Sequence, residues 1–359
     1  MIEIKHLKLV DTVSKVGSLT KAAEELFLTQ SALSHQLKEL ESHLGVEIFH
    51  RVNNQLHFTP VGKEFLEAGK DILQQMRILE DRLQQLRIDQ LRNYIHGYSE
   101  EETKRLNDQA TSISELLHWD SLWPQGSVVL EAGCGVGAQT GIISPKNPDV
   151  KFVSIDLSEK SLSKAMQMVN ELGLTNVELK LADVFEIPFA DSYFDHVFVC
   201  FLLEHLSDPG KALLELKRVL KPGGTITVIE GDHGSTYFHP DSQYARKAIQ
   251  AQVSLQKYNG GNANIGRELY PLLAAAGFTD VHPNPRIVYV NDSKPAMADL
   301  FTRNTFTAMI KGVAEEVISK NFITKDDFEK GIKDLYRTTE GGGTFCYTFF
   351  KVVARKAVL

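Results

Sequence analysis

Residues 127–138, SVVLEAGCGVGA, decide the fold of the larger part of this chain. The first half is a run of β-branched and aliphatic residues typical of a buried strand, and the second half is a glycine-rich turn. Glycines suit such a turn because the backbone must bend tightly and let a ligand approach closely. The stretch therefore predicts a strand, a ligand-binding turn and a helix in succession.

Strand and helix patterns alternate on the C-terminal side of this turn. The expected strands are residues 151–158, 176–183, 194–201 and 225–232, and the expected helices are residues 158–173 and 209–224. Four βα units in a row predict an α/β protein with a parallel, doubly wound sheet. An aromatic, β-branched stretch at residues 343–356 predicts a last strand, and a helical insertion is expected between residues 291 and 340.

The carboxyl ends of these strands carry the acidic residues that a nucleotide cofactor needs. Asp156 follows the glycine-rich turn by about twenty residues, where a carboxylate accepts hydrogen bonds from both ribose hydroxyls. Glu131 suits a cationic methionine end, and Asp183 is placed to accept from an adenine amino group. The glycine pattern alone, GxGxxA at residues 133–138, fits NAD as well as S-adenosylmethionine.

Two further segments distinguish between NAD and S-adenosylmethionine as the cofactor. VCFLLEHL at residues 199–206 and RVLKPGG at residues 218–224, together with the turn and its acids, resemble class I S-adenosylmethionine-dependent methyltransferases of the small-molecule type. The resemblance covers roughly residues 95–357 and implies a doubly wound, Rossmann-like, seven-stranded sheet with an antiparallel last strand. It implies S-adenosylmethionine as cofactor, with these contact residues: Glu131, Gly133, Cys134, Gly135, Gly137, Asp156, Leu157, Asp183, Val184, Cys200 and Phe201.

Methyl transfer is an in-line displacement that some enzymes assist with a general base. Our catalytic candidates are His205, after the fourth strand, and His233, after the fifth; Glu204 and Asp232 are further base candidates. The alternatives are a packing or cofactor contact for His205 and a loop histidine bonded to backbone for His233. Asp232, His233 and His239 match no standard ligand spacing, so we predict no metal.

The first sixty residues predict a separate helical unit. One helix ends at Gly17, the next follows Ser18, and a third lies between Thr29 and Gly45. Strand-like residues on both sides of residues 53–54 predict a wing. This is the winged helix-turn-helix layout, which predicts these contacts to double-stranded DNA: Thr29, Gln30, Ser31, Ser34, His35, Arg51 and Thr59.

Residues 17–51 and FTPVGKEFL at residues 58–66 resemble the DNA-binding region of LysR-type transcriptional regulators, and within them the regulators of methionine biosynthesis. The resemblance covers about residues 1–90 and implies binding of a dyad DNA site by a dimer or tetramer. The effector-binding domain of that family is replaced here by the methyltransferase-like part.

A heptad-like seam follows the wing. Its apolar positions fall alternately four and three residues apart, at Phe65, Gly69, Ile72, Met76, Leu79, Leu83 and Leu86. The pattern predicts a homodimer through a linker helix, with an amphipathic helix lying on its own domain as the alternative. We therefore predict three parts: a winged helix-turn-helix at residues 1–60, a linker and dimerisation helix at 61–93, and a methyltransferase domain at 94–359.

Charge and composition limit the partners. The formal net charge is −7, and six basic residues face seven acidic ones through Pro60, so DNA affinity should be modest and sensitive to salt. The longest apolar run, residues 197–203, is too short to cross a membrane. Three widely spaced cysteines and a charged N-terminus lacking signal-peptide features predict a cytoplasmic protein.

The leading hypothesis is a methyltransferase for a small-molecule acceptor, fused to a LysR-type DNA-binding region. The alternative is a transcriptional regulator that uses the methyltransferase domain as a sensor of S-adenosylmethionine or S-adenosylhomocysteine. DNA is not the expected methyl acceptor, because no [DN]PP[YFW] motif follows the fourth strand. A recent or artificial fusion of independent modules is a third interpretation. Tyr94, His96 and Tyr98 are candidates for a lid over the cofactor or for a surface helix boundary.

Overall fold

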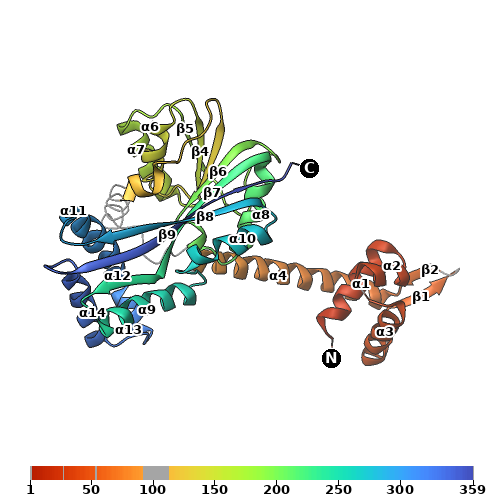
Figure 1. Ribbon diagram of the computed structural model, residues 1–359. Coiled ribbons are helices and arrows are strands. Elements are labelled where there is room, and N and C mark those ends of the chain that lie inside the picture. Colours follow the sequence, from red (N-terminus) through yellow and green to blue (C-terminus); the bar gives the residue numbers. More distant parts are fainter. Residues whose placement is uncertain (1, 27, 53–54, 92–112, 359) are drawn as a thin grey trace. The chain divides into compact units, whose positions relative to one another are not determined.

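The computed structural model describes residues 2–26, 28–52, 55–91 and 113–358 (Figure 1). Its contacts divide the chain into two compact units, Met1–Gln90 and Leu91–Leu359. No helix in these described ranges is long and apolar enough to span a membrane. The predicted boundaries at residues 60 and 93 divide the chain more finely than this partition does, and they stay predictions.

The first unit is a small helical domain followed by a long helix. Its elements are α1 (Ile4–Val16), α2 (Leu19–Glu25), α3 (Gln30–Leu44), the antiparallel strands β1 (Phe49–Val52) and β2 (Gln55–Phe58), and α4 (Pro60–Leu91). Gly17 and Gly45 end α1 and α3 in the left-handed conformation, with φ of 70° and 68°. Ser18 occupies the N-cap of α2 without a capping side-chain hydrogen bond, whereas the Thr29 hydroxyl accepts from the Ala32 amide at 3.2 Å.

The second unit is built on a seven-stranded sheet with the order β5-β4-β3-β6-β7-β9-β8. The strands are β3 (Val128–Ala132), β4 (Lys151–Asp156), β5 (Val177–Leu181), β6 (Phe194–Cys200), β7 (Leu220–His239), β8 (Thr279–Val290) and β9 (Thr344–Arg355). The first five strands in this order are parallel, and β9 runs antiparallel to both neighbours. The predicted doubly wound α/β class is confirmed.

Helices cover both faces of the sheet. They are α6 (Thr140–Lys146), α7 (Glu159–Glu171), α8 (Pro209–Val219), α9 (Gln243–Tyr258), α10 (Leu269–Ala275), α11 (Pro295–Met297), a π-helix (Ala298–Thr307), α12 (Ala308–Gly312), α13 (Ala314–Ser319) and α14 (Lys325–Arg337). Successive strand residues enter different cores: Val129 belongs to the core that includes residues of α9 and the π-helix, and Leu130 belongs to the core that includes residues of α8 and α10. In Figure 1, α9, α12, α13 and α14 gather near the start of β9.

Strand β7 is longer than predicted. It begins at Leu220, just before the KPGG segment at residues 221–224 that we expected to end the preceding helix, and it continues past the expected end at residue 232 to His239. His233 was expected in a loop after the fifth strand, and that expectation is wrong: residues 232–235 are an irregular part of the strand, where pairing with β9 shifts register between Asp232 and Tyr237. The extension is stabilised by the long partner strand β9, which local sequence at β7 cannot reveal.

Strand β8 was not predicted, because Pro283 and Pro285 interrupt its sequence pattern. Proline lacks the N–H that a central strand needs, and it is tolerated at a sheet edge. β8 pairs with β9 alone in the described sheet and so occupies such an edge.

A buried ionic network ties the segment before β3 to the last two strands. The Lys351 ammonium donates to Asp120 Oδ1 at 2.5 Å, to the Leu117 carbonyl at 3.0 Å and to the Ser121 hydroxyl at 2.9 Å. Arg286 donates to Asp120 Oδ2 at 2.5 Å. The side chains of Lys351 and Arg286 are only 3% and 8% exposed, so Asp120 neutralises two buried cations.

We predict that Asp120→Ala destabilises the second unit strongly. Removing the shared carboxylate leaves two buried cations without a counter-charge, which lowers the free energy of unfolding by about 3 kcal/mol. Urea denaturation of the full chain measures this loss. The control is Asp191→Ala, which removes an exposed partner of Arg218 and should change stability little. Equal losses in the two variants would contradict the prediction.

Candidate functional site

The glycine-rich turn after β3 is held by the end of β4. The Gly133 and Cys134 amides donate to the Ile155 carbonyl at 2.9 and 3.0 Å. The Gly135 amide donates to Asp156 Oδ2 at 2.8 Å, and the Ser158 amide donates to Asp156 Oδ1 at 2.9 Å. Burial raises the pKa of Asp156, and these backbone bonds oppose the rise. Each carboxylate oxygen keeps lone-pair capacity for a further donor.

The three glycines of the turn differ in what surrounds them. All have positive φ: 75° at Gly133, 55° at Gly135 and 84° at Gly137. A Cβ at Gly133 would meet the Leu202 side chain at 2.8 Å, and one at Gly137 would meet the Met168 side chain at 2.3 Å, so both glycines are closely packed. A Cβ at Gly135 would meet nothing within 4 Å. Gly135 is thus the position of the turn that borders open space.

Glu131 lies beneath the turn and is 2% exposed. Its Oε2 accepts from the hydroxyls of Thr140 and Ser154, each at 2.6 Å. Burial raises the pKa of Glu131, while these two hydroxyl bonds act in the opposite direction. Ser154 is the direct cross-strand neighbour of Glu131 on β4, and this pairing makes it a partner that the motif alone did not identify.

The remaining predicted cofactor residues follow the strand ends. Asp183, just after β5, accepts from the Phe185 amide at 2.9 Å, and Val184 is buried in the core beside it. Leu157 is 41% exposed next to Asp156. Cys200 is buried at the end of β6, and burial raises the pKa of its thiol, which disfavours a thiolate.

Glu230 organises the segment after β6 and was missed from the sequence. Its Oε1 accepts from the Leu202 and Leu203 amides at 3.0 and 2.7 Å, and its side chain is fully buried in β7. Burial and then the nearby charge of Glu204 raise the pKa of Glu230 well above its ordinary value. An acid inside the apolar run TITVIE was the available signal. Phe201, with a positive φ of 56°, begins the segment that Glu230 holds.

The two catalytic candidates lie in different surroundings. His205 ends a 3-10 turn (Leu203–His205), and its Nε2 lies 3.6 Å from Glu204 Oε1. His233 is 5% exposed within β7. The charge of Glu204 acts on His233, although burial is the largest effect and lowers the His233 pKa.

Hydrogen bonds define the tautomer of His233. Its Nδ1 lies 3.0 Å from the Ala263 carbonyl and 3.1 Å from the Tyr347 hydroxyl. A carbonyl can only accept, so the proton lies on Nδ1 and the lone pair lies on Nε2. Nε2 faces the Met309 sulfur at 3.3 Å. The basic nitrogen of His233 is therefore covered by a side chain of α12.

Asp232 is not free to act as a base. Arg267 donates to both of its oxygens at 2.7 Å, a bidentate pair with the acid 2% exposed. His239 lies near the end of β7, opposite Thr344. Among the residues that the structure describes, no cluster of three His, Cys, Asp or Glu side chains has the arrangement of a metal site. The lid candidates Tyr94, His96 and Tyr98 lie outside the described residues.

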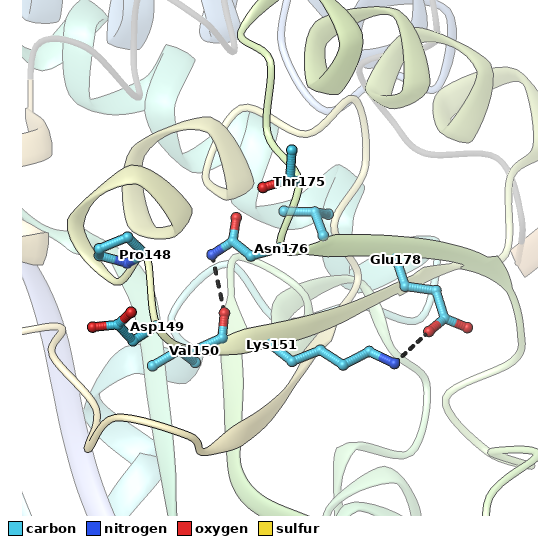
Figure 2. Close-up of a pocket in the computed structure, with 8 residues that line it drawn as sticks. Pro148, Asp149, Val150, Lys151, Thr175, Asn176 and Glu178 are labelled. Carbon is cyan, nitrogen blue, oxygen red and sulfur yellow. Dashed lines mark hydrogen bonds and ion pairs between the residues drawn. The ribbon is translucent and has the colours of Figure 1, made fainter.

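A surface pocket of the second unit lies at the amino ends of the strands. Its lining residues belong to the starts of β4 and β5 and the segments before them (Figure 2). The Asn176 amide donates to the Val150 carbonyl at 3.0 Å, and Lys151 pairs with Glu178 at 3.0 Å. These groups satisfy one another at the amino ends of the strands. This pocket is therefore distinct from the cofactor candidates, which lie at the carboxyl ends.

The predicted DNA contacts gather at the start of α3, with two exceptions. Gln30, Ser31 and His35 are exposed there, and Ser34 is half-buried. The Thr59 hydroxyl donates to the Glu47 carbonyl at 2.7 Å and accepts from the Gly62 amide at 2.9 Å, so its proton is used within the unit. The backbone of Arg51 lies in β1, and its side chain is outside the described residues.

Comparisons with known proteins match the two units to two families. Residues 4–63 match the family described as bacterial regulatory helix-turn-helix protein, lysR family, and residues 124–277 match a methyltransferase domain. Both predicted resemblances are confirmed. The HTH-type transcriptional regulator MetR of Salmonella typhimurium is 47% identical over 76 residues, which cover 21% of this chain and 24% of that protein.

Relatives of the second unit are more distant. An uncharacterised 37.1 kDa protein of a Streptomyces fradiae transposon is 30% identical over 201 residues, 55% of this chain and 57% of that protein. The 27-O-demethylrifamycin SV methyltransferase of Amycolatopsis mediterranei is 29% identical over 191 residues, 50% of this chain and 69% of that enzyme. A solved phosphoethanolamine N-methyltransferase of Haemonchus contortus covers 69% of this chain and 52% of its own at 18% identity, with a TM-score of 0.44.

We predict that His233 is neutral at pH 7 with its proton on Nδ1. Burial lowers its pKa below 6.5, so stability falls as the pH drops from 6.5 toward the folded-state pKa, where the unfolded chain binds more protons. Nitrogen-15 NMR of the histidine rings reads both the tautomer and the titration midpoint.

Two variants test the cause. Met309→Ala should expose Nε2 to water and move the pKa of His233 upward. The control, Tyr347→Phe, should leave the tautomer unchanged, because the Ala263 carbonyl sets it. A proton found on Nε2 in the wild-type chain would contradict the assignment.

Proposed function

Since residues 124–277 are a methyltransferase domain and residues 4–63 a LysR-type helix-turn-helix, we propose that this chain methylates a small molecule with S-adenosylmethionine and binds double-stranded DNA through its first unit. The observation that carries the proposal is the turn at Gly135. Its backbone borders open space and is locked by Asp156 at 2.8 Å. A half-buried turn with one open side and a carboxylate beside it fits a nucleoside with two ribose hydroxyls.

The donor and acceptor set of the site fits S-adenosylmethionine. Asp156 would hold the ribose, Asp183 the adenine amino group and Glu131 the cationic methionine end, whose ammonium group would donate to the Glu131 carboxylate. When bound, the cofactor supplies an activated methyl group. Phe201 and Cys200 would border its methionine part and keep water away from the reacting atoms.

Residues of β7 and α12 would determine how the proton of the methyl acceptor is removed. In this proposal His233 accepts that proton at Nε2, while the Ala263 carbonyl keeps Nδ1 protonated and steadies the imidazolium that forms. Met309 must move aside for the acceptor to reach Nε2, since the sulfur now lies 3.3 Å from it. His205, beside Glu204, remains the second catalytic candidate.

A sensor of S-adenosylmethionine is the second candidate function. It is favoured by the 47% identity of the first unit to MetR. This identity agrees with the predicted resemblance of the first unit to regulators of methionine biosynthesis. Both functions need the same cofactor site, and they differ in turnover. Release of S-adenosylhomocysteine with any compound of a metabolite panel supports the enzyme. DNA binding that changes with cofactor while no compound is methylated supports the sensor.

We predict that Gly135→Ala weakens binding of S-adenosylmethionine at least tenfold while the unit stays folded. The added methyl group enters the space that the proposed cofactor occupies, whereas the free protein has nothing within 4 Å of it. Isothermal titration calorimetry measures the binding.

Gly173→Ala is the matched control. Gly173 has a similar φ of 63° and an equally open side, but it lies beyond the C-terminal end of α7, before β5. Both alanines bear the same left-handed strain of about 1 kcal/mol. Equal affinities in the two variants would contradict a cofactor at Gly135.

We also propose that α4 pairs two copies of the chain. The start of the seam packs on its own unit, where Phe65 packs against the core and a Cβ at Gly69 would lie 3.4 Å from the Leu7 side chain. Further along, Ile72 and Leu79 are 48% and 55% exposed. Apolar residues exposed at heptad spacing on a 32-residue helix fit a coiled-coil partner. Such pairing would compensate for the balanced charge of the DNA-reading part.

We predict that the double change Ile72→Glu and Leu79→Glu converts a dimer into monomers and lowers DNA affinity at least tenfold. Like charges at the seam repel across the helix pair and leave the helix itself intact. Analytical ultracentrifugation and footprinting on genomic fragments measure the two effects. The control is Glu67→Lys, an exposed position away from the seam. A wild-type chain that sediments as a monomer would refute the pairing.

A further inference from the structure

Two glutamines on α9 form a buried chain of hydrogen bonds with a defined direction, called the relay below. Gln252 and Gln256 are 0% and 2% exposed and lie one turn apart. The side-chain amide of Gln252 donates to Gln256 Oε1 at 3.0 Å, and that of Gln256 donates to the backbone carbonyl of Glu204 at 3.0 Å. These bonds link α9 to the segment after β6, where the catalytic candidate His205 lies.

The direction of the relay follows from its last member. The Glu204 carbonyl can only accept, so the NH₂ group of Gln256 faces it and Gln256 Oε1 faces Gln252. Gln252 must then present its own NH₂ group to Gln256. Its carbonyl oxygen consequently points the other way and is buried without a hydrogen-bond partner among the described residues.

A buried acceptor of this kind is costly. Leaving it unpaired costs about 1–3 kcal/mol, so such atoms are rare unless a ligand or an ordered water completes them. The π-helix, which shares a hydrophobic core with α9, has the same property: the hydroxyls of Thr302 and Thr307 are also buried and lack partners in the described structure. A π-helix is itself uncommon and frequently marks functional sites.

Gln256 also donates to Glu204 Oε2 at 3.3 Å, so an acid lies at the end of the relay. Glu204 and Glu230 act on each other electrostatically, and His233 is neutral because burial lowers its pKa. Gln252 Oε1 can only accept a hydrogen bond, whereas the two threonine hydroxyls can donate or accept. A ligand that satisfies Gln252 must therefore bring a donor.

We propose that Gln252 Oε1 receives the hydrogen-bond donor of the methyl acceptor, which is therefore a compound carrying a hydroxyl or amino group beside its apolar body. This inference rests on the proposed cofactor-dependent function and names the chemistry that the same site selects. Gln252 acts as a specificity-determining residue: a site that buries an unmatched acceptor discriminates strongly against ligands lacking the donor.

The test compares binding of matched probes to the S-adenosylhomocysteine-loaded full chain. Phenol represents the hydroxyl source, benzylamine the amino source and toluene the donor-free body. In the wild-type chain, phenol or benzylamine should bind at least tenfold more tightly than toluene, and the better of the two identifies the source. Gln252→Leu, which keeps the volume and removes the carbonyl, should reduce that ratio to about one.

Gln256→Leu is the matched control. It breaks the same bond between the two glutamines and is equally buried, but it leaves the carbonyl of Gln252 in place. A merely structural role of Gln252 predicts the same probe ratios and similar losses of stability in both variants. The proposal predicts a much smaller change of the ratio in Gln256→Leu, and a stability of Gln252→Leu at least equal to that of Gln256→Leu.

The outcomes separate this inference from the proposed function. Equal binding of all three probes to the wild-type chain, an unchanged ratio in Gln252→Leu, or an ordered water that stays on Gln252 Oε1 in a probe-bound crystal overturns the inference. Probe discrimination that depends on Gln252 without methylation of any compound upholds the inference and overturns the enzyme. For any compound that is methylated, Gln252→Leu should raise KM at least tenfold with kcat within about threefold.

Discussion

The hydrogen bond from the Gly135 amide to the Asp156 carboxylate is the contact on which the arrangement at the carboxyl ends of the strands depends. One side chain accepts the amide of a left-handed residue after β3 and the amide of Ser158 before α7. Two separate βα turns are thereby fixed to each other at one point. Because Gly135 borders open space while the flanking glycines are packed, this fixed point is also the place where a ligand can approach the backbone.

Glu230 performs the corresponding task on the other half of the sheet. It brings a carboxyl group into the core of β7 and binds two amides of the segment after β6. Such burial is unfavourable for the charged form, which is why its pKa is raised. The benefit is a defined path for residues 201–205, which carry Phe201, Glu204 and His205. The proposed cofactor site and the proposed acceptor site are thus supported by two acids, Asp156 on β4 and Glu230 on β7, with β3 and β6 between their strands.

The long strands β7 and β9 make the second unit more than a nucleotide-binding sheet. Their pairing continues beyond the register shift after Asp232 and carries His233 into contact with the helices of the insertion. Tyr347 of β9, Met309 of α12 and the Ala263 carbonyl then surround one imidazole. The first unit has a simpler design, in which glycine caps and a small leucine-rich core position the exposed start of α3.

The sequence alone determined the strands β3 to β6, the glycine turn, Asp156 and the helix-turn-helix, because periodicity and motif spacing lie within contiguous residues. Only the tertiary structure decided which groups meet across long sequence separations. Arg267 donates a hydrogen bond to Asp232, 35 residues away in the sequence, and Lys351 donates one to Asp120, 231 residues away. The edge strand β8 and the extension of β7 depend likewise on β9, their distant partner. A local pattern records what a segment prefers, whereas burial and pairing with remote segments determine which side chains are left for a ligand.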